Sequence, residues 1–439
     1  MNTNNRLKVG TITLFIIMFI FIAFTNSQAA AVSKTTTPKT TTPTTTTSGT
    51  NTYYIDYVRG SDANSGKSST TPWKLCPGMK GFVGKYTHQA GDTFIFKSSV
   101  TWPSSVLPLT IRYSGSSGKI DTYKGDSTTM PPVFDGGGAV NNLIFASKKS
   151  YFNIEGIKMI NAGLPNIANK KYGFQIEHCM DFKISKCTLK PETWLGIYIR
   201  ASSGTYSNIN ILDNDISGAA MGIVVATSAA NTIIDNVVIA GNKIHDFTSQ
   251  IGGGIHGDGI HLWGSPNSDI TQYISNLKIY NNSFYGSFAR SFGTKGGMTA
   301  FIYFEGATQG AEIYNNTMSY TDKPTKENIF EAMITLSGIT GRGGSHNVHD
   351  NTATGTNPGM SAGIRLVAAP NCTINKNIFS GMKYVYNIDT TSITGAKINH
   401  NTANYADQYD KVGIWGGAFK TWPKWQALGN DINGTNQKP

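Results

Sequence analysis

One short phrase, built around an asparagine, returns along the chain and constrains the fold more than any other feature. It is clearest in Asn276-Leu-Lys-Ile-Tyr-Asn-Asn-Ser-Phe284, where an apolar residue precedes the second asparagine of the pair by three positions and another follows it by two. By subtraction of their numbers, successive asparagines are 24 to 40 residues apart, the spacing expected of solenoid coils. The recurring pairs are Ile211 with Asn214, Ile239 with Asn242, Ile279 with Asn282, Ile313 with Asn316, Val348 with Asn351, Ile374 with Asn377 and Ile398 with Asn401.

The pattern around each asparagine predicts two short strands joined at a bend, because apolar residues alternate on both sides of it. Asparagine tolerates the left-handed backbone that a sharp bend needs, so we expect it to adopt that conformation itself. A single coil cannot bury its apolar face alone, and the coils must therefore stack. Stacking would bring the asparagines into a ladder whose amides bond along the stack.

A second phrase, a glycine followed by alternating apolar residues, predicts a third strand in each coil. It occurs as Gly173-Phe-Gln-Ile-Glu, Gly196-Ile-Tyr-Ile-Arg, Gly222-Ile-Val-Val-Ala, Gly259-Ile-His-Leu-Trp and Gly363-Ile-Arg-Leu-Val. With both phrases, residues 51–430 resemble the right-handed parallel β-helix superfamily of pectate lyases and related polysaccharide-processing proteins. The resemblance implies an all-β fold, a right-handed single-stranded parallel β-helix. It does not determine the reaction, since one fold hosts many functions.

The N-terminus is typical of a secretion signal, because Arg6 and Lys8 precede an uncharged apolar run and small residues follow it. We expect a signal peptide over residues 1–31 and a solvated Thr/Pro-rich linker over 32–50. The protein would then be secreted or displayed at the cell surface, and it would meet a membrane only if this segment stays uncleaved. The apolar run is short for a membrane span.

Charge indicates the kind of partner. The chain of 439 residues has a formal net charge of +11, which suits an anionic partner such as an acidic polysaccharide. The basic residues are scattered and form no run, so we expect no nucleic-acid partner. We expect a monomer.

Residues 51–140 are predicted to form an N-terminal cap and a loop-rich segment, residues 141–410 the coils, and residues 411–439 a C-terminal cap. The first part resembles the entry of secreted β-helix proteins, which implies that a strand, an Asp/Asn/Gly turn and a short helix cover the open end of the stack. Asp56, Asp62 and Asn64 could hold calcium or act as turn residues. The pattern of residues 421–429 predicts a short helix, and the side chains of Trp422, Trp425 and Leu428 would cover the last coil.

Cys179 and Cys187 belong to one coil and have two interpretations. They could form a disulfide, or they could be two small buried thiols. Cys187 stands where the other coils have the recurring asparagine.

Three long insertions precede neighbouring third strands and are expected to wall a cleft. They lie within residues 245–263, 287–297 and 320–328. Alternation predicts what lines the floor: His261 and Trp263 would face outward between Ile260 and Leu262. In the next coil we place Ala300, Ile302 and Phe304 inward, which sends Tyr303 and Glu305 outward; the opposite register would bury Phe301 and Tyr303 instead. The flanking outward residues are Arg365 on one side and Arg200 and Glu177 on the other.

This surface combines aromatic faces for sugar rings with charged groups for hydroxyls and carboxylates. His256, Asp258 and His261 form an H-x-D-x-x-H cluster that could act in acid/base catalysis, could bind a metal, or could merely bond the backbone of a turn. The phrase Gly-Asp-Gly-Ile-His is similar to the Asp-Gly strand of polygalacturonase-type hydrolases, where the resemblance implies acid/base work for Asp258. No Gly-His-Gly or Arg-Ile-Lys follows, so that mechanism cannot be transferred whole. We predict no metal ligand among these residues and no required cofactor. Calcium binding is kept as an alternative.

Two reactions fit these residues. In a lyase, Arg290, Lys295 or Arg365 would neutralise a uronate carboxylate while His261, His256 or Tyr303 takes the α-proton. In a glycosidase, Asp258 and Glu305 would be the two carboxylates across the scissile bond. The alternative is a glycan-binding surface protein or adhesin without turnover. Convergence of His261, Asp258 and Glu305 in one groove would favour the enzyme over the adhesin.

Overall fold

The computed structural model describes residues 51–163, 171–247, 257–264, 269–288, 299–321, 330–339, 341–355, 362–405 and 411–436. They belong to one compact unit, Thr46–Pro439. The expected signal peptide and linker lie outside the described residues and stay predictions. Within the described part, no helix is both long and apolar enough to cross a membrane.

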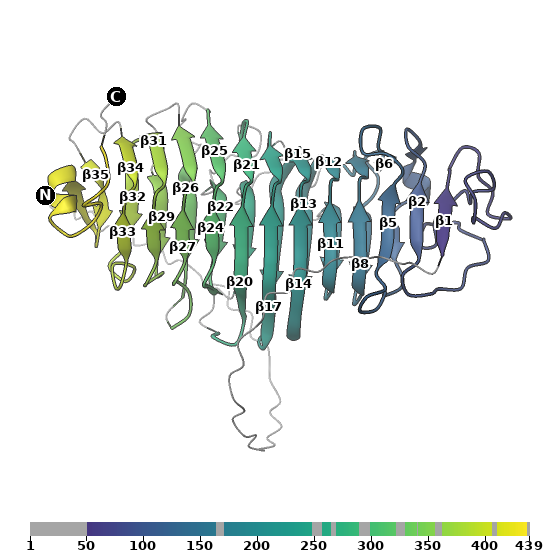
Figure 1. The fold of residues 1–439 in the computed structure, drawn as a ribbon, viewed down its shortest axis with the longest axis horizontal. Helices are drawn as coiled ribbons and strands as arrows, with labels where there is room; N and C mark the ends of the chain where they lie inside the picture. Colours follow the sequence, from purple (N-terminus) through teal and green to yellow (C-terminus); the bar gives the residue numbers. More distant parts are fainter. Residues whose placement is uncertain are drawn as a thin grey trace, which may run out of the picture. The chain divides into compact units, whose positions relative to one another are not determined.

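The described strands form three parallel sheets that together build a single-stranded parallel β-helix, as predicted. The first sheet holds the strands that precede the recurring asparagines, and Figure 1 shows them side by side from β1 to β33. Ile239 pairs with Ile279 in the neighbouring strand, so like residues stack on like along the sheet. The strands of this sheet are β1 (Thr52–Ile55), β2 (Thr93–Phe96), β5 (Asp121–Gly125), β8 (Ser150–Glu155), β11 (Met180–Ser185), β14 (Gly204–Leu212), β17 (Thr232–Ala240), β20 (Tyr273–Tyr280), β23 (Thr308–Gln309), β24 (Glu312–Tyr314), β27 (Asn347–His349), β30 (Thr373–Asn375) and β33 (Lys397–Asn399).

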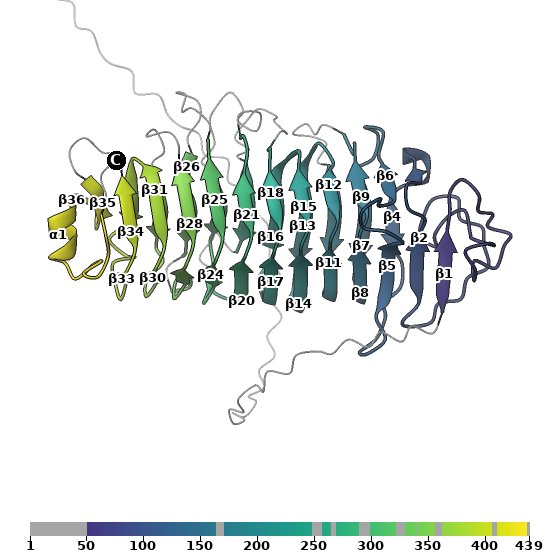
Figure 2. The ribbon, with the colours of Figure 1, turned by 45° about the horizontal axis from the view of Figure 1, so that its top comes forward.

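The second sheet holds the short strands that follow each asparagine, and Figure 2 shows them next to the first sheet. Its inward residues, such as Ile216, Ile244 and Phe284, are at most 1% exposed. Burying each such side chain contributes about 1.5–3 kcal/mol, which only stacked coils can gain. The strands are β3 (Thr101–Trp102), β6 (Val133–Asp135), β9 (Lys158–Ile160), β12 (Thr188–Lys190), β15 (Asp215–Ser217), β18 (Lys243–His245), β21 (Ser283–Tyr285), β25 (Thr317–Tyr320), β28 (Thr352–Gly355), β31 (Ile378–Met382) and β34 (Thr402–Tyr405).

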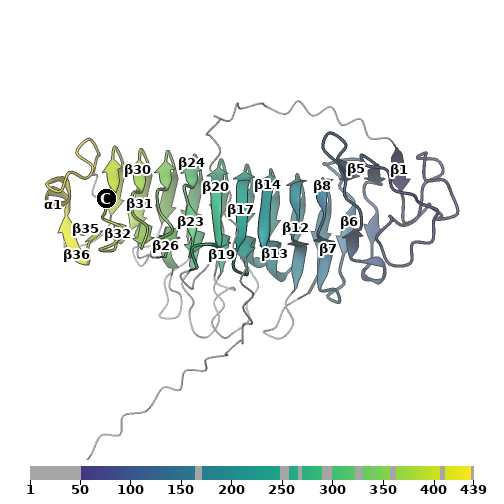
Figure 3. The same ribbon diagram turned by 90° about the horizontal axis from the view of Figure 1, so that it is seen from below.

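The third sheet contains the predicted glycine-led strands, and Figure 3 shows it from below. All its pairings are parallel except the last, where β36 turns back along β35. The strands are β4 (Leu109–Ile111), β7 (Asn142–Ser147), β10 (Tyr172–Glu177), β13 (Thr193–Ala201), β16 (Ala219–Thr227), β19 (Asp258–Trp263), β22 (Thr299–Glu305), β26 (Phe330–Ser337), β29 (Ala362–Val367), β32 (Tyr384–Ile388), β35 (Lys411–Trp415) and β36 (Ala418–Thr421).

The predicted asparagine ladder is present. The side-chain amide and the backbone N–H of Asn214 both donate to Oδ1 of Asn242, at 2.9 and 3.0 Å. Asn282 bonds to Asn316 in the same way, and the pattern continues to Asn401. Because an unpaired buried polar group costs about 1–3 kcal/mol, each ladder asparagine needs a coil on both sides of it.

The bend differs from our prediction in one detail. The left-handed residue is the one before the ladder asparagine, as at Asp213 (φ 56°), Asn281 (φ 54°) and Lys376 (φ 56°). The asparagine side chain must point into the coil to reach its neighbours, so the chain turns one residue earlier.

Asp431 ends the ladder at its C-terminal side. Its Oδ1 accepts hydrogen bonds from the backbone and the side-chain amide of Asn401, at 3.1 and 2.9 Å. Its Oδ2 accepts from the Tyr386 hydroxyl at 2.6 Å and from the Trp425 indole at 3.1 Å. These four donors compensate the burial of a carboxylate that is 0% exposed.

The C-terminal helix is shorter than predicted, since α1 spans Trp422–Gln426. Trp425 is 0% exposed and stacks on Tyr386 with the ring centroids 4.5 Å apart, so it does cover the last coil. Trp422 is partly buried against the core. Leu428, however, is 47% exposed and does not cover the last coil. Thr421 stands at the N-cap position but makes no side-chain capping bond, which differs from our prediction.

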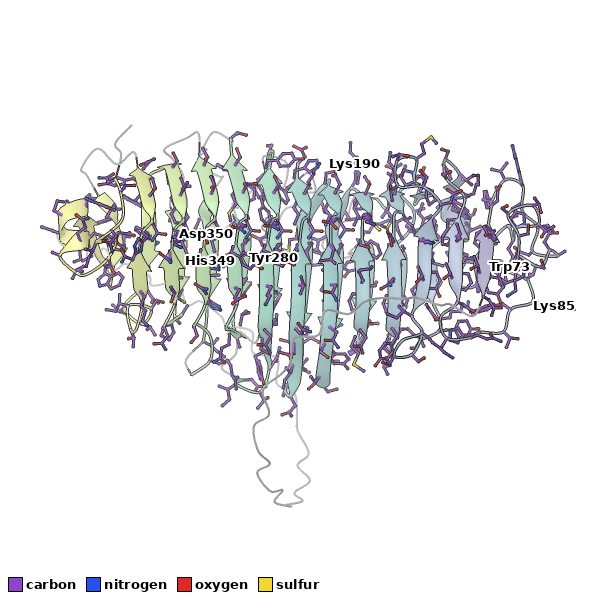
Figure 4. All side chains as sticks on the ribbon, in the orientation of Figure 1. Trp73, Lys85, Lys190, Tyr280, His349 and Asp350 are labelled. Atoms are coloured by element: carbon purple, nitrogen blue, oxygen red, sulfur yellow. The ribbon has the colours of Figure 1, made fainter. Side chains whose placement is uncertain are left out.

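The N-terminal end is closed by aromatic rings and not by the helix we expected. Tyr53 stacks on Trp73 and on Phe94, with ring centroids 4.6 and 5.5 Å apart, and Figure 4 labels Trp73 at this end. Within residues 51–163 the helical element is a 3-10 turn, Ser104–Val106. Strands β1 to β6 already belong to the three sheets, so coiling begins earlier than predicted. These strands are two to five residues long, too short to show alternation in the sequence.

The calcium candidates are turn residues. Oδ1 of Asp56 accepts hydrogen bonds from the backbone N–H groups of Val58 and Arg59, both at 3.0 Å. Oδ1 of Asp62 accepts from two backbone N–H groups, those of Lys74 and Leu75. The amide of Asn64 donates to a backbone carbonyl. Their oxygens and amides are thus engaged with the backbone of the cap.

The cysteines are free, buried thiols, so the disulfide alternative is wrong. The backbone N–H of Cys187 donates to Oδ1 of Asn214 at 3.0 Å, which places Cys187 at the N-terminal end of the asparagine ladder.

Candidate functional site

The outer face of β19 and β22 carries the candidate site. Ile260 and Leu262 are 0% exposed, and the alternation sends His261 and Trp263 to the outer side. The strand register pairs His261 with Tyr303 and Trp263 with Glu305, which confirms the outward placement of Tyr303 and Glu305.

One residue of that coil departs from simple alternation. Phe301 belongs to the core together with Ile302, although we had placed Ala300 inward in its stead. Ala300 is the strand partner of Asp258. Two consecutive inward residues interrupt the alternation at this point, and we call this interruption the slip; the pairing of β22 with β19 itself stays in one register.

The alternation in β19 is interrupted in the same way at Gly259. A Cβ at Gly259 would lie 2.4 Å from the carbonyl oxygen of Phe301 and 2.8 Å from Cδ1 of Phe284, so this glycine faces the core. Ile260 faces the core too. The slip puts Asp258 on the same side of the strand as His261, whereas strict alternation would have turned Asp258 toward the core with Ile260.

Asp258, His261 and Glu305 converge around the imidazole. Nδ1 of His261 lies 2.8 Å from Oδ2 of Asp258, and Nε2 lies 3.4 Å from Oε2 of Glu305. Oδ1 of Asp258 accepts a hydrogen bond from the backbone N–H of Ala300 at 3.1 Å. The side chains of Asp258 and His261 are 0% and 3% exposed, while that of Glu305 is 38% exposed. Glu305 is therefore the member of the trio that solvent or a substrate can reach.

The environment keeps His261 protonated at neutral pH. Burial by itself lowers the pKa of His261, but the bonds and charges of Asp258 and Glu305 outweigh burial and raise this pKa to about 9. The imidazole is thus a cation with both nitrogens directed at carboxylates. This changes the role that we expected for His261, because a protonated imidazole cannot take an α-proton.

Tyr303 lies over the imidazole, with ring centroids 5.2 Å apart and 27° between the planes. Burial, and then the charges of Asp258 and Glu305, raise the pKa of Tyr303 to about 12, so its phenol keeps its proton. Trp263 is 43% exposed and its ring lies 6.3 Å from that of His261. The site thus has one exposed aromatic face and one buried phenol.

Arg365 continues the row beyond Tyr303. Register pairs join Tyr303 to Thr335 and Thr335 to Arg365. Burial lowers the pKa of Arg365, which the charges of Tyr303 and Asp389 partly oppose. Thr335 is 0% exposed and its hydroxyl has no hydrogen-bond partner, a feature that the sequence did not reveal.

Arg200 and Glu177 lie on the other side of the site. They pair with each other across β10 and β13, and Arg200 is two strands away from Trp263. At about 4.8 Å per strand this separation is roughly 10 Å. Nε of Arg200 donates to the Ser228 hydroxyl at 3.1 Å, so its position is partly fixed.

The other three predicted site residues, His256, Arg290 and Lys295, lie outside the described residues. Their segments join strands of the second sheet to β19 and β22. No group of three or more metal-ligating side chains occurs in the part of the chain that the structure describes.

A family profile described as the right-handed β-helix region matches residues 133–239. A search of curated proteins found no match. Among solved structures, a GH136 lacto-N-biosidase from Eubacterium ramulus is similar at 12% identity and a TM-score of 0.52, over 81% of this chain and 63% of that one. This protein is a right-handed parallel β-helix.

Two other structures with this β-helix are similar at lower scores. An alginate lyase from Paenibacillus has 15% identity and a TM-score of 0.40, covering 68% of this chain and 91% of that one. A rhamnogalacturonan lyase has 11% identity and a TM-score of 0.39, covering 83% and 84%. The β-helix described here spans less than two thirds of the lacto-N-biosidase chain, and at these identities the likeness concerns the fold alone.

Proposed function

We propose that this β-helix is a carbohydrate-active enzyme that cleaves an acidic polysaccharide by β-elimination at the outer face of β19 and β22. The observation that carries the proposal is the convergence of Asp258, His261 and Glu305 beside Tyr303. The choice of a carbohydrate draws on the lacto-N-biosidase that shares the fold. We further propose that the protein acts as a monomer outside the cell, after removal of residues 1–31.

Hydrolysis by two carboxylates fits the described residues less well. Asp258 is 0% exposed and both of its oxygens are engaged, so it cannot touch a glycosidic oxygen. The next described carboxylates on this face are Asp389, about three strands from Glu305, and Glu177, four strands away. These steps amount to roughly 14 and 19 Å, beyond the spacing of about 5–9.5 Å that glycosidases use.

Elimination needs one accessible base, one proton donor and a cation, and in this proposal Glu305, Tyr303 and Arg365 would supply them. Glu305 would accept the proton α to the sugar carboxylate, and the electrons of that C–H bond would form the new double bond. Tyr303, which keeps 6% of its surface exposed whereas Asp258 keeps none, would donate its proton to the departing glycosidic oxygen as the C–O bond breaks. Arg365 would neutralise the sugar carboxylate. The proton on Glu305 would then return to Tyr303, whose transient phenolate the adjacent His261 cation stabilises.

Asp258 would be a positioning residue in this scheme. It holds the imidazole in one orientation and keeps it charged, without touching the substrate.

The test is to incubate the purified protein with a panel of acidic and neutral polysaccharides, following new reducing ends and the ultraviolet absorbance of unsaturated uronates. We expect both signals on an acidic polymer, and their loss in Glu305→Gln. The matched control is Glu312→Gln, because Glu312 is a half-exposed carboxylate on the first sheet that pairs with Lys278.

Reducing ends without absorbance would contradict elimination and indicate hydrolysis. Neither signal on the whole panel, with binding retained, would indicate a glycan-binding protein or adhesin instead.

A further inference from the structure

The first coils carry a depression far from His261, with a cavity volume of about 540 Å³. This volume lies within the range of about 300–1,000 Å³ that is common for small-ligand sites. The depression opens on the outer face of β1 and β2 in the first sheet, whereas the candidate site uses the third sheet. Five strand steps separate β4, in the coil of β2, from β19, which is roughly 24 Å along the stack.

The walls of the depression are held by the backbone. The segment from Gly66 to Trp73 runs beside β1: the N–H of Tyr54 donates to the Gly66 carbonyl at 2.8 Å, and the N–H of Trp73 donates to the Tyr54 carbonyl at 2.9 Å. The N–H of Gly66 also donates to the Thr71 carbonyl at 3.2 Å, which closes the loop between them. Figure 4 labels Trp73 at this end of the molecule. A wall fixed in this way needs little reorganisation to receive a ligand.

The floor is apolar and partly aromatic. Tyr54 and Ile95 pair in register on the outer face, both half-buried, and Pro72 adjoins them. Ser69 and Thr70, two residues with hydroxyl groups, also line the depression. An aromatic face beside hydroxyl groups is the combination that binds a sugar ring by its apolar face and its edge.

The rim also carries charge. Nζ of Lys97 lies 3.0 Å from Oδ2 of Asp126, and the Asp126 carboxylate also accepts the Ser98 N–H at 2.6 Å. Arg59 is exposed at the same rim, and no described carboxylate forms a salt bridge with it. A guanidinium that is not committed to an internal carboxylate can bind an external one in a bidentate manner.

We propose that this depression is a second carbohydrate-binding site, which takes one acidic sugar unit with its ring on Tyr54 and its carboxylate on Arg59. Only the choice of an acidic sugar rests on the proposed function. The site would hold the protein on a polymer without taking part in cleavage.

The test is isothermal titration calorimetry in a Glu305→Gln background, so that no ligand is consumed. The probes are the disaccharides of galacturonate, mannuronate and glucuronate, with cellobiose and inorganic phosphate as comparisons. We expect an acidic disaccharide to bind at two sites. Adding Arg59→Ala should weaken one of them roughly 10- to 100-fold, the loss expected for a charged hydrogen-bonded pair. The matched control is Arg112→Ala, another exposed arginine that does not line the depression.

Equal binding by the Arg59→Ala and Arg112→Ala proteins would overturn the inference, as would absence of binding by all three acidic disaccharides. Phosphate binding as tightly as the sugars would also overturn it, because the depression would then be a simple anion site. In protein that keeps Glu305, Arg59→Ala should leave kcat/KM on a short acidic oligosaccharide unchanged. If no polysaccharide is cleaved but binding still depends on Arg59, the proposed function fails and this inference stands.

Discussion

Among the described residues, two histidines are each held between two carboxylates under a tyrosine ring, and they differ in burial. His245, at the end of β18, lies 2.9 Å from Asp215 and 2.8 Å from Asp246, and its ring stacks on Tyr285 with centroids 4.5 Å apart. His261 lies 2.8 and 3.4 Å from its own two carboxylates, with Tyr303 stacked above. Carboxylates raise the pKa of both imidazoles.

The difference lies in what surrounds the two clusters. The side chains of Asp215 and Asp246 are 46% and 57% exposed, so water screens both charges. Asp258 is 0% exposed, and it holds the buried His261 cation beside the accessible carboxylate of Glu305. Residue type alone therefore does not distinguish a surface ion pair from a candidate catalytic group; burial of the orienting carboxylate does.

The largest expected contrast is in activity. His261→Gln should lower kcat/KM for cleavage by at least about 100-fold, because the cation beside Tyr303 and Glu305 is lost. His245→Gln should change it by less than about twofold, because His245 lies outside the candidate site and its two carboxylates are exposed to water. Reducing-end assays on both variants, with circular dichroism to verify folding, would measure the contrast. Comparable losses in the two variants would remove the distinction between the clusters.

The next contrast is in stability. Asp258→Asn should lower the free energy of unfolding by about 3 kcal/mol, because removing one partner of a buried pair leaves the other uncompensated. Asp215→Asn should cost less than about 1 kcal/mol, since its carboxylate is half-exposed. Denaturant unfolding at pH 7 measures both. A cost below 1 kcal/mol for Asp258→Asn would show that the buried pair contributes little.

The strand slip can be tested separately from the charges. Gly259→Ala should destabilise the protein by about 1–3 kcal/mol and also abolish cleavage, because the new Cβ would displace Phe301 and with it the alignment of Asp258. Gly173→Ala is the matched control, since a Cβ there would lie 2.5 Å from the Gly196 carbonyl oxygen, several coils away. We expect a similar stability loss in the control without loss of activity per folded molecule. Full activity in folded Gly259→Ala protein would argue against the importance of the slip.

The last expected effect is a dependence of stability on pH. The pKa of folded His261 is about 9, above its ordinary value of 6.5, so its protonation stabilises the fold fully below pH 6.5. This contribution should disappear as the pH rises through 9. Tm measured from pH 7 to 10 should therefore fall more steeply in the wild type than in His261→Gln. Parallel curves would mean that His261 is not held as a cation.

Much of the fold could be read from the sequence, because solenoid contacts repeat with the chain. The spacing of the asparagines predicted the ladder, and the alternation of Ile260 and Leu262 predicted that His261 and Trp263 face outward. The spacing of the glycine-led phrase likewise predicted the third sheet. These predictions are confirmed because each depends on a local pattern that every coil repeats.

The tertiary structure decided what depends on contacts between coils. The slip at Gly259 follows from Phe301 and Phe284 of the next coil, which occupy the space of a Cβ, and it moved Asp258 to the side of His261. Asp431 ends the ladder because Asn401 reaches it across 30 residues. A one-dimensional pattern shows which residues alternate. Burial, and with it the charge of His261, depends on neighbours that are distant in sequence, and only the stacked coils bring these together.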